Sequence, residues 1–375
     1  MRIVQLVTGT PLFGGSDAHV RDLSIGLRAR GHECIVMAGP PEGLLAEQLR
    51  GNGVTVLTIP ALRKPIRPFA DAISLFQVIR AFHEVQPDIV ATHTAKAGFI
   101  GRIAARAMGV PVFFTPHGLS FVDRKSGDLI GFRLLLERMA ARVGGEMIAV
   151  CDAERNIALR YLGSTGIRIS TIRNGLPDCE TRGEKCRGPV VITMIARFVR
   201  QKDHSTLVRA LLTLKHLEWE LRLAGTGPLL ESIKQLVEEC GLTPRVCFMN
   251  ECRDTPRLLA ESDIYVLSSN YEAFPISILE AMRAGIPVVA TDTGGVREAI
   301  QDEYNGFLVP PRDVSRLAER LSSLIRSAEL RTSMGVQSRR RFTQEFEWRS
   351  MLDKTEALYA NTLRNKMNCE MAPSQ

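Results

Sequence analysis

The sequence predicts an α/β protein built from two doubly wound, parallel-sheet halves. Short apolar runs that suit buried strands alternate with segments of helical spacing along most of the 375 residues. The alternation occurs in two series, separated by a stretch rich in Gly, Pro and charge at 174–189. Because βα repetition gives parallel sheets covered by helices, each series predicts one Rossmann-like domain.

The first series occupies the amino-terminal half. Its apolar runs predict strands at 2–7, 33–38, 54–59, 88–93, 110–116, 146–150 and 167–173. Segments with helical spacing lie between them at 18–31, 69–85 and 96–109. The first and third of these end at a glycine, which is typical of a helix terminus.

The second series predicts strands at 190–197, 219–225, 245–250, 263–269, 286–292 and 306–310. We therefore expect an amino-terminal domain at 1–180 and a carboxyl-terminal domain at 181–345. Residues 346–375 are expected to form a helix that crosses back to the first domain, and then a disordered tail. Two such domains should face a central cleft, with ligands at the carboxyl ends of the strands.

The amino-acid composition and the net charge indicate which kinds of partner the protein could bind. Hydrophobic residues make up 45% and charged residues 24%, which is ordinary for a globular protein with real cores. The net charge of +7 suits an acidic partner, such as an anionic membrane, a phosphorylated substrate or nucleic acid. Most of the surplus lies in residues 1–185, which carry 23 basic and 17 acidic side chains. Basic and aromatic residues are not interleaved, so no nucleic acid partner is expected.

The sequence also predicts a cytoplasmic protein. The opening MRIVQLV is too short and too soon followed by polar residues for a secretory signal. There is no apolar run of about 18 residues, so no transmembrane helix is expected. The eight cysteines are scattered without a C-x-x-C pair, which favours reduced thiols over a zinc site.

A carboxylate lies on each side of a Phe-Pro turn in residues 271–295, YEAFPISILEAMRAGIPVVATDTGG. Pro275 suits a helix start, so the first-turn amides of 276–279 would form an anion site. Glu280 lies about 6 Å further along the helix and could accept hydrogen bonds from a ribose. Glu272 could do the same for a second polyol. A phosphate between two diols describes a nucleotide sugar.

Other interpretations of this stretch stay open. The spacing of Ser277 and Glu280 is that of a capping box, in which Glu280 only closes the helix. Glu272 could be a solvated loop charge. A glycosidase acid/base pair is disfavoured, because a helix amino terminus between the carboxylates favours a bound anion.

The segment ARFVRQKDHSTLVRALL, at 196–212, also follows a predicted strand. Arg197 and Lys202 lie five residues apart in its loop, where they could neutralise a diphosphate leaving group. The alternative is a solvated loop.

Glycines and a histidine follow three further strands. Gly14 and Gly15 precede a helix, but TGTPLFGGSDAHV is not the G-x-G-x-x-G of a dehydrogenase. His117 follows the fifth strand in FFTPHGLSF. Gly225 and Gly227 follow another strand and would let the backbone approach a ligand.

With these pieces in order, the chain resembles the retaining GT-B glycosyltransferases called glycosyl transferases group 1, or family four, over residues 1 to about 350. The most specific element is Glu272 to Glu280, a Glu-x7-Glu pair, followed by Arg197 with Lys202. FGGSDAHV, PHGLSF and GTGP add support. Asp203 and Asn250 stand where the family often has glycine, and Asn tolerates left-handed backbone.

The resemblance implies roles for matching positions. Arg197 and Lys202 would bind the donor diphosphate, Glu280 the ribose and Glu272 the sugar hydroxyls. His117 would contact the donor sugar or stabilise charge at the reacting carbon, so His117 and Glu272 are the expected catalytic residues. The expected donor-binding residues are Gly14, Gly15, Arg197, Lys202, Gly225, Gly227, Phe274, Pro275, Ile276, Ser277, Ile278, Leu279 and Glu280. No metal and no cofactor are expected, because cationic side chains and a helix dipole can do a metal's electrostatic work.

The implied reaction moves a hexose or N-acetylhexosamine from a nucleotide diphosphate, with UDP favoured over GDP, to a glycan or a polyprenyl-linked acceptor. The stretch THTAKAGFIGRIAARAMGVPVFFTPHGLSF most resembles members that build bacterial surface polysaccharides. Basic and apolar residues at 61–69 and 123–142 could dock on an anionic membrane. The rival interpretations are a nucleotide-sugar epimerase of similar fold and a non-catalytic nucleotide-sugar-binding subunit.

Overall fold

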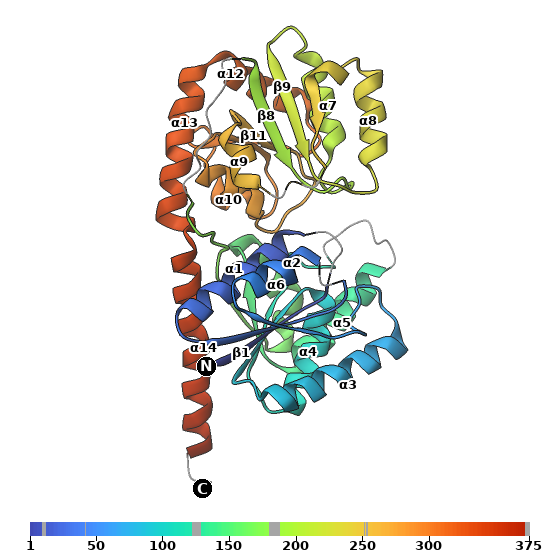
Figure 1. The fold of residues 1–375 in the computed structure, drawn as a ribbon, viewed down its shortest axis with the longest axis vertical. Helices are drawn as coiled ribbons and strands as arrows, with labels where there is room; N and C mark the ends of the chain where they lie inside the picture. Colours follow the sequence, from blue (N-terminus) through green and yellow to red (C-terminus); the bar gives the residue numbers. More distant parts are fainter. Residues whose placement is uncertain are drawn as a thin grey trace. The chain divides into compact units, whose positions relative to one another are not determined.

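The chain forms two α/β units (Figure 1). The computed structural model describes residues 1–9, 13–41, 43–121, 129–179, 188–250, 252 and 254–371. Unit 1 consists of Met1–Gly175 and helix α14 (Trp348–Met371), and unit 2 is Leu176–Glu347. Several predictions fall partly outside the described residues: the stretches at 8–20, 123–142, 174–189 and 248–254, and the tail after 371.

Unit 1 contains a seven-stranded parallel sheet in the order β3-β2-β1-β4-β5-β6-β7. The strands are β1 (Arg2–Val7), β2 (Glu33–Ala38), β3 (Thr55–Thr58), β4 (Ile89–His93), β5 (Val112–Thr115), β6 (Glu146–Ala149) and β7 (Arg168–Thr171). All seven were predicted, with ends that differ by at most two residues. The helices are α1 (Gly15–Ala29), α2 (Gly43–Gly51), α3 (Pro68–Val85), α4 (Ala95–Ala107), α5 (Leu129–Val143), α6 (Asp152–Leu162) and the 3-10 turn η2 (Gly163–Thr165).

Helices cover both faces of this sheet, which explains its apolar strands (Figure 1). Alternate residues of β1 point to opposite faces. Ile3 and Val7 belong to a buried cluster with residues of α1, α2 and α14. Val4 and Leu6 belong to a second cluster with residues of α3 and α4.

Helix α14 is part of unit 1 although it ends the chain. It packs beside α1, where Arg30 binds Asp353 and Glu356 with N–O distances of 2.6 and 2.8 Å. The ring of Tyr359 lies 4.6 Å from that of Phe113 in β5. The chain therefore leaves unit 1 after residue 175 and returns to it at residue 348.

Helices α3, α4 and α5 form one layer on the second face. Helix α4 packs against both neighbours. Lys96 of α4 binds Asp71 of α3 at 2.5 Å, and Arg102 of α4 forms a buried ion pair with Glu137 of α5. These pairs fix the outer surfaces of α3 and α5 relative to each other.

Unit 2 contains a six-stranded parallel sheet in the order β10-β9-β8-β11-β12-β13. The strands are β8 (Val190–Ile195), β9 (Trp219–Ala224), β10 (Val246–Phe248), β11 (Ile264–Leu267), β12 (Val288–Thr291) and β13 (Gly306–Val309), all within predicted runs. The helices are α7 (His204–Thr213), α8 (Leu230–Glu239), α9 (Thr255–Ala260), α10 (Ile276–Arg283), α11 (Val296–Ala299), α12 (Val314–Arg326) and α13 (Ala328–Arg341), with shorter turns η3 (Thr243–Arg245) and η4 (Phe342–Phe346).

The strand order places a topological switch point in each sheet. In unit 1 the chain order reverses between β1 and β4, and in unit 2 it reverses between β8 and β11. Loops that leave such neighbouring strands diverge to opposite faces, which opens a crevice for ligands at their carboxyl ends. The predicted doubly wound fold is confirmed, and both sets of predicted site residues follow strands at or beside these points.

Candidate functional site

The loops after β8 and β11 form one connected surface in unit 2. The backbone N–H of Asn270 donates to the Gln201 carbonyl at 2.7 Å, and its side chain donates to the Arg200 carbonyl at 2.9 Å. Gln201 Nε2 donates to the Tyr271 carbonyl, also at 2.9 Å. The sequence analysis considered the two loops separately, whereas in the structure hydrogen bonds connect them.

Lys202 and Glu272, predicted for different parts of a donor, form an ion pair. Their side chains are 16% and 7% exposed, so the pair is largely shielded from water. Lys202 Nζ has three hydrogens and Glu272 has two carboxylate oxygens, so each keeps capacity for another partner. Arg197, in the same loop as Lys202, is exposed. The predicted cations therefore lie on one loop, with the predicted carboxylate beside one of them.

Gly225 and Gly227 have a reason within the chain itself. A Cβ at Gly225 would lie 2.2 Å from the Ala196 carbonyl oxygen, and one at Gly227 would lie 2.5 Å from that of Phe198. Both glycines have positive φ, at 141° and 155°. They let the 225–227 loop cover the backbone that carries Arg197, so they shape the predicted phosphate loop from behind.

The loop that carries Glu272 is held by a residue to which the sequence analysis assigned no role. Gly294 has φ 56°, and a Cβ there would lie 1.9 Å from the Glu272 carbonyl oxygen. The N–H of Gly295 donates to the Ala273 carbonyl at 2.7 Å. The Gly pair after β12 was the available signal, but only the fold shows what it touches.

Helix α10 begins as predicted but without a capping box. Its N-cap is Pro275, so Ser277 is inside the first turn and cannot cap it. Glu280 instead accepts a hydrogen bond from Thr255 Oγ1 at 3.1 Å. The capping-box interpretation is therefore wrong.

The run 274–279, predicted to bind the donor with the phosphate at 276–279, offers mainly its backbone. The side chains of Phe274, Pro275, Ile276, Ile278 and Leu279 are buried, and only Ser277 is partly exposed. The N–H of Ile278 already donates to the Pro275 carbonyl at 3.2 Å.

Two non-glycine residues adopt the backbone that the family usually gives to glycine. Asn250 has φ 48°, as its tolerance for left-handed backbone predicted, and its carbonyl accepts from the N–H of Gly225. Asp203 has φ 45°, and its carboxylate accepts from Ser205 and Thr206 at 2.7 and 2.8 Å. The turn geometry survives both replacements.

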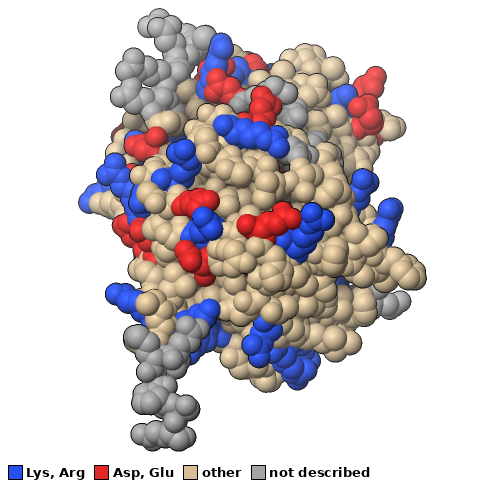
Figure 2. All heavy atoms as spheres, turned by 60° about the horizontal axis from the view of Figure 1, so that its bottom comes forward, with Lys and Arg blue, Asp and Glu red and all other residues tan. Residues whose placement is uncertain are grey.

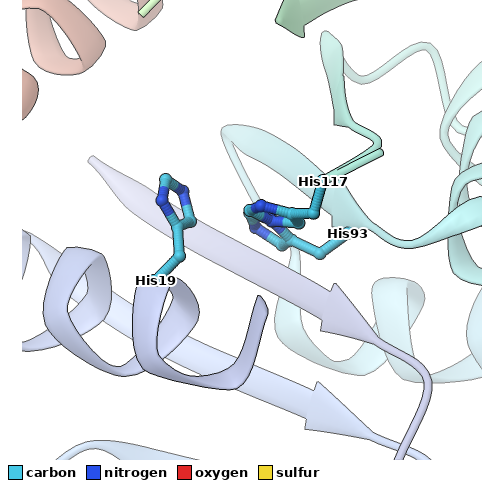
Figure 3. A group of neighbouring side chains, drawn as sticks. All are labelled: His19, His93 and His117. Carbon is cyan, nitrogen blue, oxygen red and sulfur yellow. The ribbon is translucent and has the colours of Figure 1, made fainter. Parts of the chain in front are cut away.

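Unit 1 gathers three histidines at its own switch point. His19 lies on α1, His93 ends β4, and His117 follows β5. One nitrogen from each lies within 4.8 Å of the others. Figure 3 shows the rings of His93 and His117 pointing toward that of His19. The sequence analysis singled out only His117, because no spacing rule connects positions 74 and 98 residues from the first histidine.

All three imidazoles are neutral at physiological pH. Burial lowers the pKa of His19 to about 4, against a weaker opposing effect of the hydrogen bond to Asn174. Burial also holds the pKa of His93 and of His117 well below the ordinary value, and the neighbouring histidines lower them further. Neutral imidazoles could ligate a first-row divalent cation, so this is the one group of the described residues that suits a metal.

Gly14 and Gly15 lie at the start of α1, the helix that carries His19. Gly14 is the N-cap of α1, and its N–H donates to the Asp17 carboxylate at 2.8 Å. A Cβ at Gly14 would meet only Asp17, at an ordinary 3.6 Å. No contact within the described chain therefore requires a glycine there. Gly15 is the first residue of the helix.

Comparisons with known proteins bear on the family and the fold. The model described as Glycosyltransferase Family 4 matches residues 13–178, and the model described as Glycosyl transferases group 1 matches residues 182–341. Over 339 residues the chain is 28% identical to the Escherichia coli UDP-Gal:α-D-GlcNAc-diphosphoundecaprenol α-1,3-galactosyltransferase, covering 84% of the chain and 86% of that relative. Over 322 residues it is 25% identical to the Staphylococcus aureus capsular polysaccharide biosynthesis glycosyltransferase CapM, covering 81% and 84%.

Solved structures share the fold. The Anabaena protein HepE, in complex with UDP, superposes with a TM-score of 0.80 at 20% identity, covering 96% of this chain and all of that one. Sucrose-phosphate synthase from Thermosynechococcus elongatus gives a TM-score of 0.82, also at 20% identity, with 97% and 100% covered.

Two doubly wound parallel sheets, matched by these structures over nearly the whole chain, give the protein the GT-B fold. The chain belongs to glycosyltransferase family 4, the glycosyl transferases group 1. It is a retaining enzyme that uses a nucleotide-sugar donor. The predicted resemblance and enzyme class are confirmed.

Proposed function

We propose that the enzyme transfers a hexose or N-acetylhexosamine from a UDP-sugar to a glycan or polyprenyl-linked acceptor during synthesis of a cell-surface polysaccharide. The observation that carries the donor assignment is the joined pair of loops at the β8–β11 switch point, which places Lys202 against Glu272. No described helix is both long and apolar enough to cross a bilayer.

The donor roles follow from charge and exposure. Arg197 and Lys202 bind the diphosphate, and the first turn of α10 adds backbone donors. Glu280, already bonded to Thr255, binds the ribose. Glu272 stays paired with Lys202 through one part of its carboxylate and accepts hydrogen bonds from the sugar hydroxyls with the rest. Gly14 and Gly15 approach the phosphates, and His117 contacts the sugar.

The choice of UDP and of a surface polysaccharide rests on relatives. The galactosyltransferase carries UDP-Gal and a diphosphoundecaprenol-linked sugar in its name, and HepE was solved with UDP and with UDP-glucose. Relatives named for capsule and exopolysaccharide synthesis support the same setting.

A nucleotide-release assay tests the donor assignment. Purified chain is incubated with UDP-, GDP- and ADP-sugars without acceptor, alongside Lys202→Ala and the matched control Lys234→Ala, an exposed lysine of unit 2. We expect slow release from one UDP-sugar, abolished in Lys202→Ala and unchanged in Lys234→Ala. Conversion of the donor to its epimer would instead support the epimerase. Silence across the panel, with no thermal shift by any donor, would support a non-catalytic subunit.

Helix α3 has an exposed apolar face that could bind the membrane in which a polyprenyl-linked acceptor is held. Phe69, Ile73 and Phe76 are all exposed, Phe69 at 90%, and their spacing of four and three residues puts them on one face. Exposed Arg63 and Arg67 precede them. An apolar stripe beside basic residues suits the surface of an anionic membrane, where a polyprenyl-linked acceptor is held.

Helix α5, in the same layer, repeats the pattern. Phe132, Leu135 and Met139 are exposed at the same spacing, with Arg142 exposed at the helix end. Figure 2 brings the lower side of Figure 1 forward, and its lower part shows Lys and Arg among uncharged residues without visible Asp or Glu. We propose that the enzyme works in the cytoplasm, docked through this layer on the inner face of the membrane.

Vesicle sedimentation tests the docking. Wild type should pellet with phosphatidylglycerol vesicles and stay in solution with phosphatidylcholine vesicles. The double variant Phe69→Ser, Phe76→Ser should bind phosphatidylglycerol vesicles at least tenfold more weakly than wild type. Val336→Ser, at an exposed apolar residue of unit 2, should bind them as wild type does. Equal binding by the double variant, or no binding by wild type, would contradict the proposal.

A further inference from the structure

The backbone at His117 is held in an uncommon conformation. Its φ is 54°, in the left-handed region that few residues other than glycine adopt. Such a conformation persists where surrounding contacts hold it, and it occurs preferentially at functional positions.

A buried carboxylate holds that backbone in place. Glu154, in the first turn of α6, accepts a hydrogen bond from the N–H of Gly118 at 2.7 Å and from the N–H of Val150 at 2.9 Å. It thereby ties the residue after His117 to the segment that follows β6. The main chain of the His117 loop is fixed independently of the imidazole.

The imidazole is fixed by a second set of contacts. His117 Nε2 lies 3.0 Å from His93 Nδ1, and His93 Nε2 lies 2.7 Å from Gln5 Oε1. The ring centroids of His93 and His117 lie 5.3 Å apart, much further than the bonded nitrogens, so the rings meet end to end. Gln5 and His93 are fully buried on the neighbouring strands β1 and β4. The sheet itself therefore anchors the chain of contacts.

The direction of the hydrogens follows from the last acceptor. The structure places the oxygen of the Gln5 amide, rather than its NH2 group, toward His93. An amide oxygen only accepts, so with this orientation of the amide His93 Nε2 carries the hydrogen that it donates to Gln5 Oε1. His93 is neutral, so its Nδ1 bears a lone pair and accepts from His117 Nε2–H. His117, also neutral, then has its lone pair on Nδ1.

We propose that His93, oriented by Gln5, is a positioning residue that fixes His117 as the Nε2–H tautomer and leaves Nδ1 as the acceptor for a hydroxyl of the donor sugar. The tautomer assignment rests on these contacts, and the role of Nδ1 toward a sugar hydroxyl rests on the proposed function. Together with the Glu154 contact, it fixes both the loop and the ring of His117 before substrate binds.

A metal ion is the competing use of these histidines. A cation would have to lie about 2.0–2.1 Å from each nitrogen and replace the hydrogen between His93 and His117. The end-to-end arrangement of those rings favours the hydrogen bond. The contact of His19 Nδ1 with Asn174 Oδ1, at 3.0 Å, fits either use, because a metal-ligating histidine also bonds through its other ring nitrogen.

The test reads the tautomer directly. The full chain is labelled with ¹⁵N-histidine, and the ring nitrogens of His117 are assigned by comparison with His117→Gln. We expect the Nε2–H tautomer in wild type, a mixture of tautomers in His93→Leu, and the wild-type pattern in His93→Asn, whose Oδ1 can still accept from His117. If His93→Leu fails to fold, Gln5→Met is the substitute variant. It removes only the acceptor for His93 Nε2–H, so it should give a mixture of His93 tautomers.

Kinetics separate positioning from packing. His93→Leu should lower kcat about ten- to a hundredfold, the range usual for outer-shell partners, with donor KM within about threefold. His93→Asn should recover kcat to within about threefold of wild type. An Nδ1–H tautomer in wild-type His117, or an unchanged tautomer in His93→Leu, would overturn the assignment.

The remaining outcomes are also distinct. A stoichiometric shift of the His19, His93 and His117 signals on adding Zn²⁺ at micromolar concentration would establish a metal site instead. If His117→Gln transfers sugar at the wild-type rate, the proposed role of His117 fails, although the tautomer measurement still decides whether His93 fixes its ring.

Discussion

The two units share an architecture but place opposite chemistry at the same topological position. Each has a parallel sheet whose order reverses beside its first strand, at β1–β4 in unit 1 and at β8–β11 in unit 2. Unit 1 fills that position with three neutral histidines, of which His19 and His93 are buried and His117 is half-buried. Unit 2 fills it with a Lys202–Glu272 ion pair and an exposed arginine. The fold thus supplies the location, and the side chains decide whether it holds fixed charge or neutral hydrogen-bonding groups.

This contrast suggests a division of labour. A diphosphate needs cations, which unit 2 has. A sugar is neutral, and neutral imidazoles can orient its hydroxyls without binding the phosphates competitively. Four variants can break or sharpen the contrast.

Lys202→Ala should have the largest effect, because it removes a cation from the proposed diphosphate site and leaves Glu272 unpaired. We expect kcat/KM for the donor to fall about a thousandfold, the size seen when a main electrostatic contact is lost. Donor affinity, measured by calorimetry, should fall with it. Lys234→Ala should behave as wild type, and an unchanged Lys202→Ala would remove unit 2 from donor binding.

Gly294→Ala should damage the same unit through its backbone. A methyl group would be 1.9 Å from the Glu272 carbonyl at a φ of 56°. We expect the free energy of unfolding to fall by about 3 kcal/mol, with weaker donor binding as the Glu272 loop shifts. Chemical denaturation measures this, and Gly188→Ala, which meets nothing within 4 Å, is the control.

His117→Gln should separate the units by kinetics. If unit 1 acts on the sugar while unit 2 binds the nucleotide, kcat should fall about a hundredfold with the donor Kd within about threefold. His83→Gln, an exposed histidine of α3, should be neutral. A large rise in donor Kd for His117→Gln, with kcat preserved, would reverse the assignment of roles.

His19→Gln should show the neutrality of the unit 1 cluster as a pH effect. The folded pKa of about 4 lies below the ordinary 6.5, so folding favours the neutral form. That stability is present above pH 6.5 and is lost as the pH falls toward 4. Between pH 8 and pH 5, wild type should therefore lose about 2 kcal/mol more than the variant. Parallel pH profiles of unfolding for wild type and His19→Gln would mean that His19 is not held neutral.

Much of this molecule could be predicted from local pattern. Every strand of both sheets lies within a predicted apolar run, because strands buried on both faces are continuously hydrophobic. The unit 2 residues Arg197, Lys202, Glu272 and Glu280 were singled out because they are charged and follow such runs closely. Charge beside a buried strand is a local signal.

The unit 1 cluster gave no such signal. His19 and His93 stood in quoted segments, but histidine is common in ordinary structural positions, and only His117 was chosen. Glu154 and Gly294 were missed because each contacts a backbone group that is distant in sequence. The capping-box alternative failed because Pro275, rather than Ser277, is the N-cap of the helix.

The sequence by itself determined the class of fold, the strands and the charged residues that follow β8 and β11, because hydrophobic period and charge are properties of neighbouring residues. Only the tertiary structure decided which strands are adjacent and which loops are joined. It also decided that three histidines lie together, with Gln5 bonded to His93 and the buried Glu154 bonded to the residue after His117. Strand order is set by packing between segments tens of residues apart. Burial then fixed the protonation of those histidines, which their identity alone leaves open.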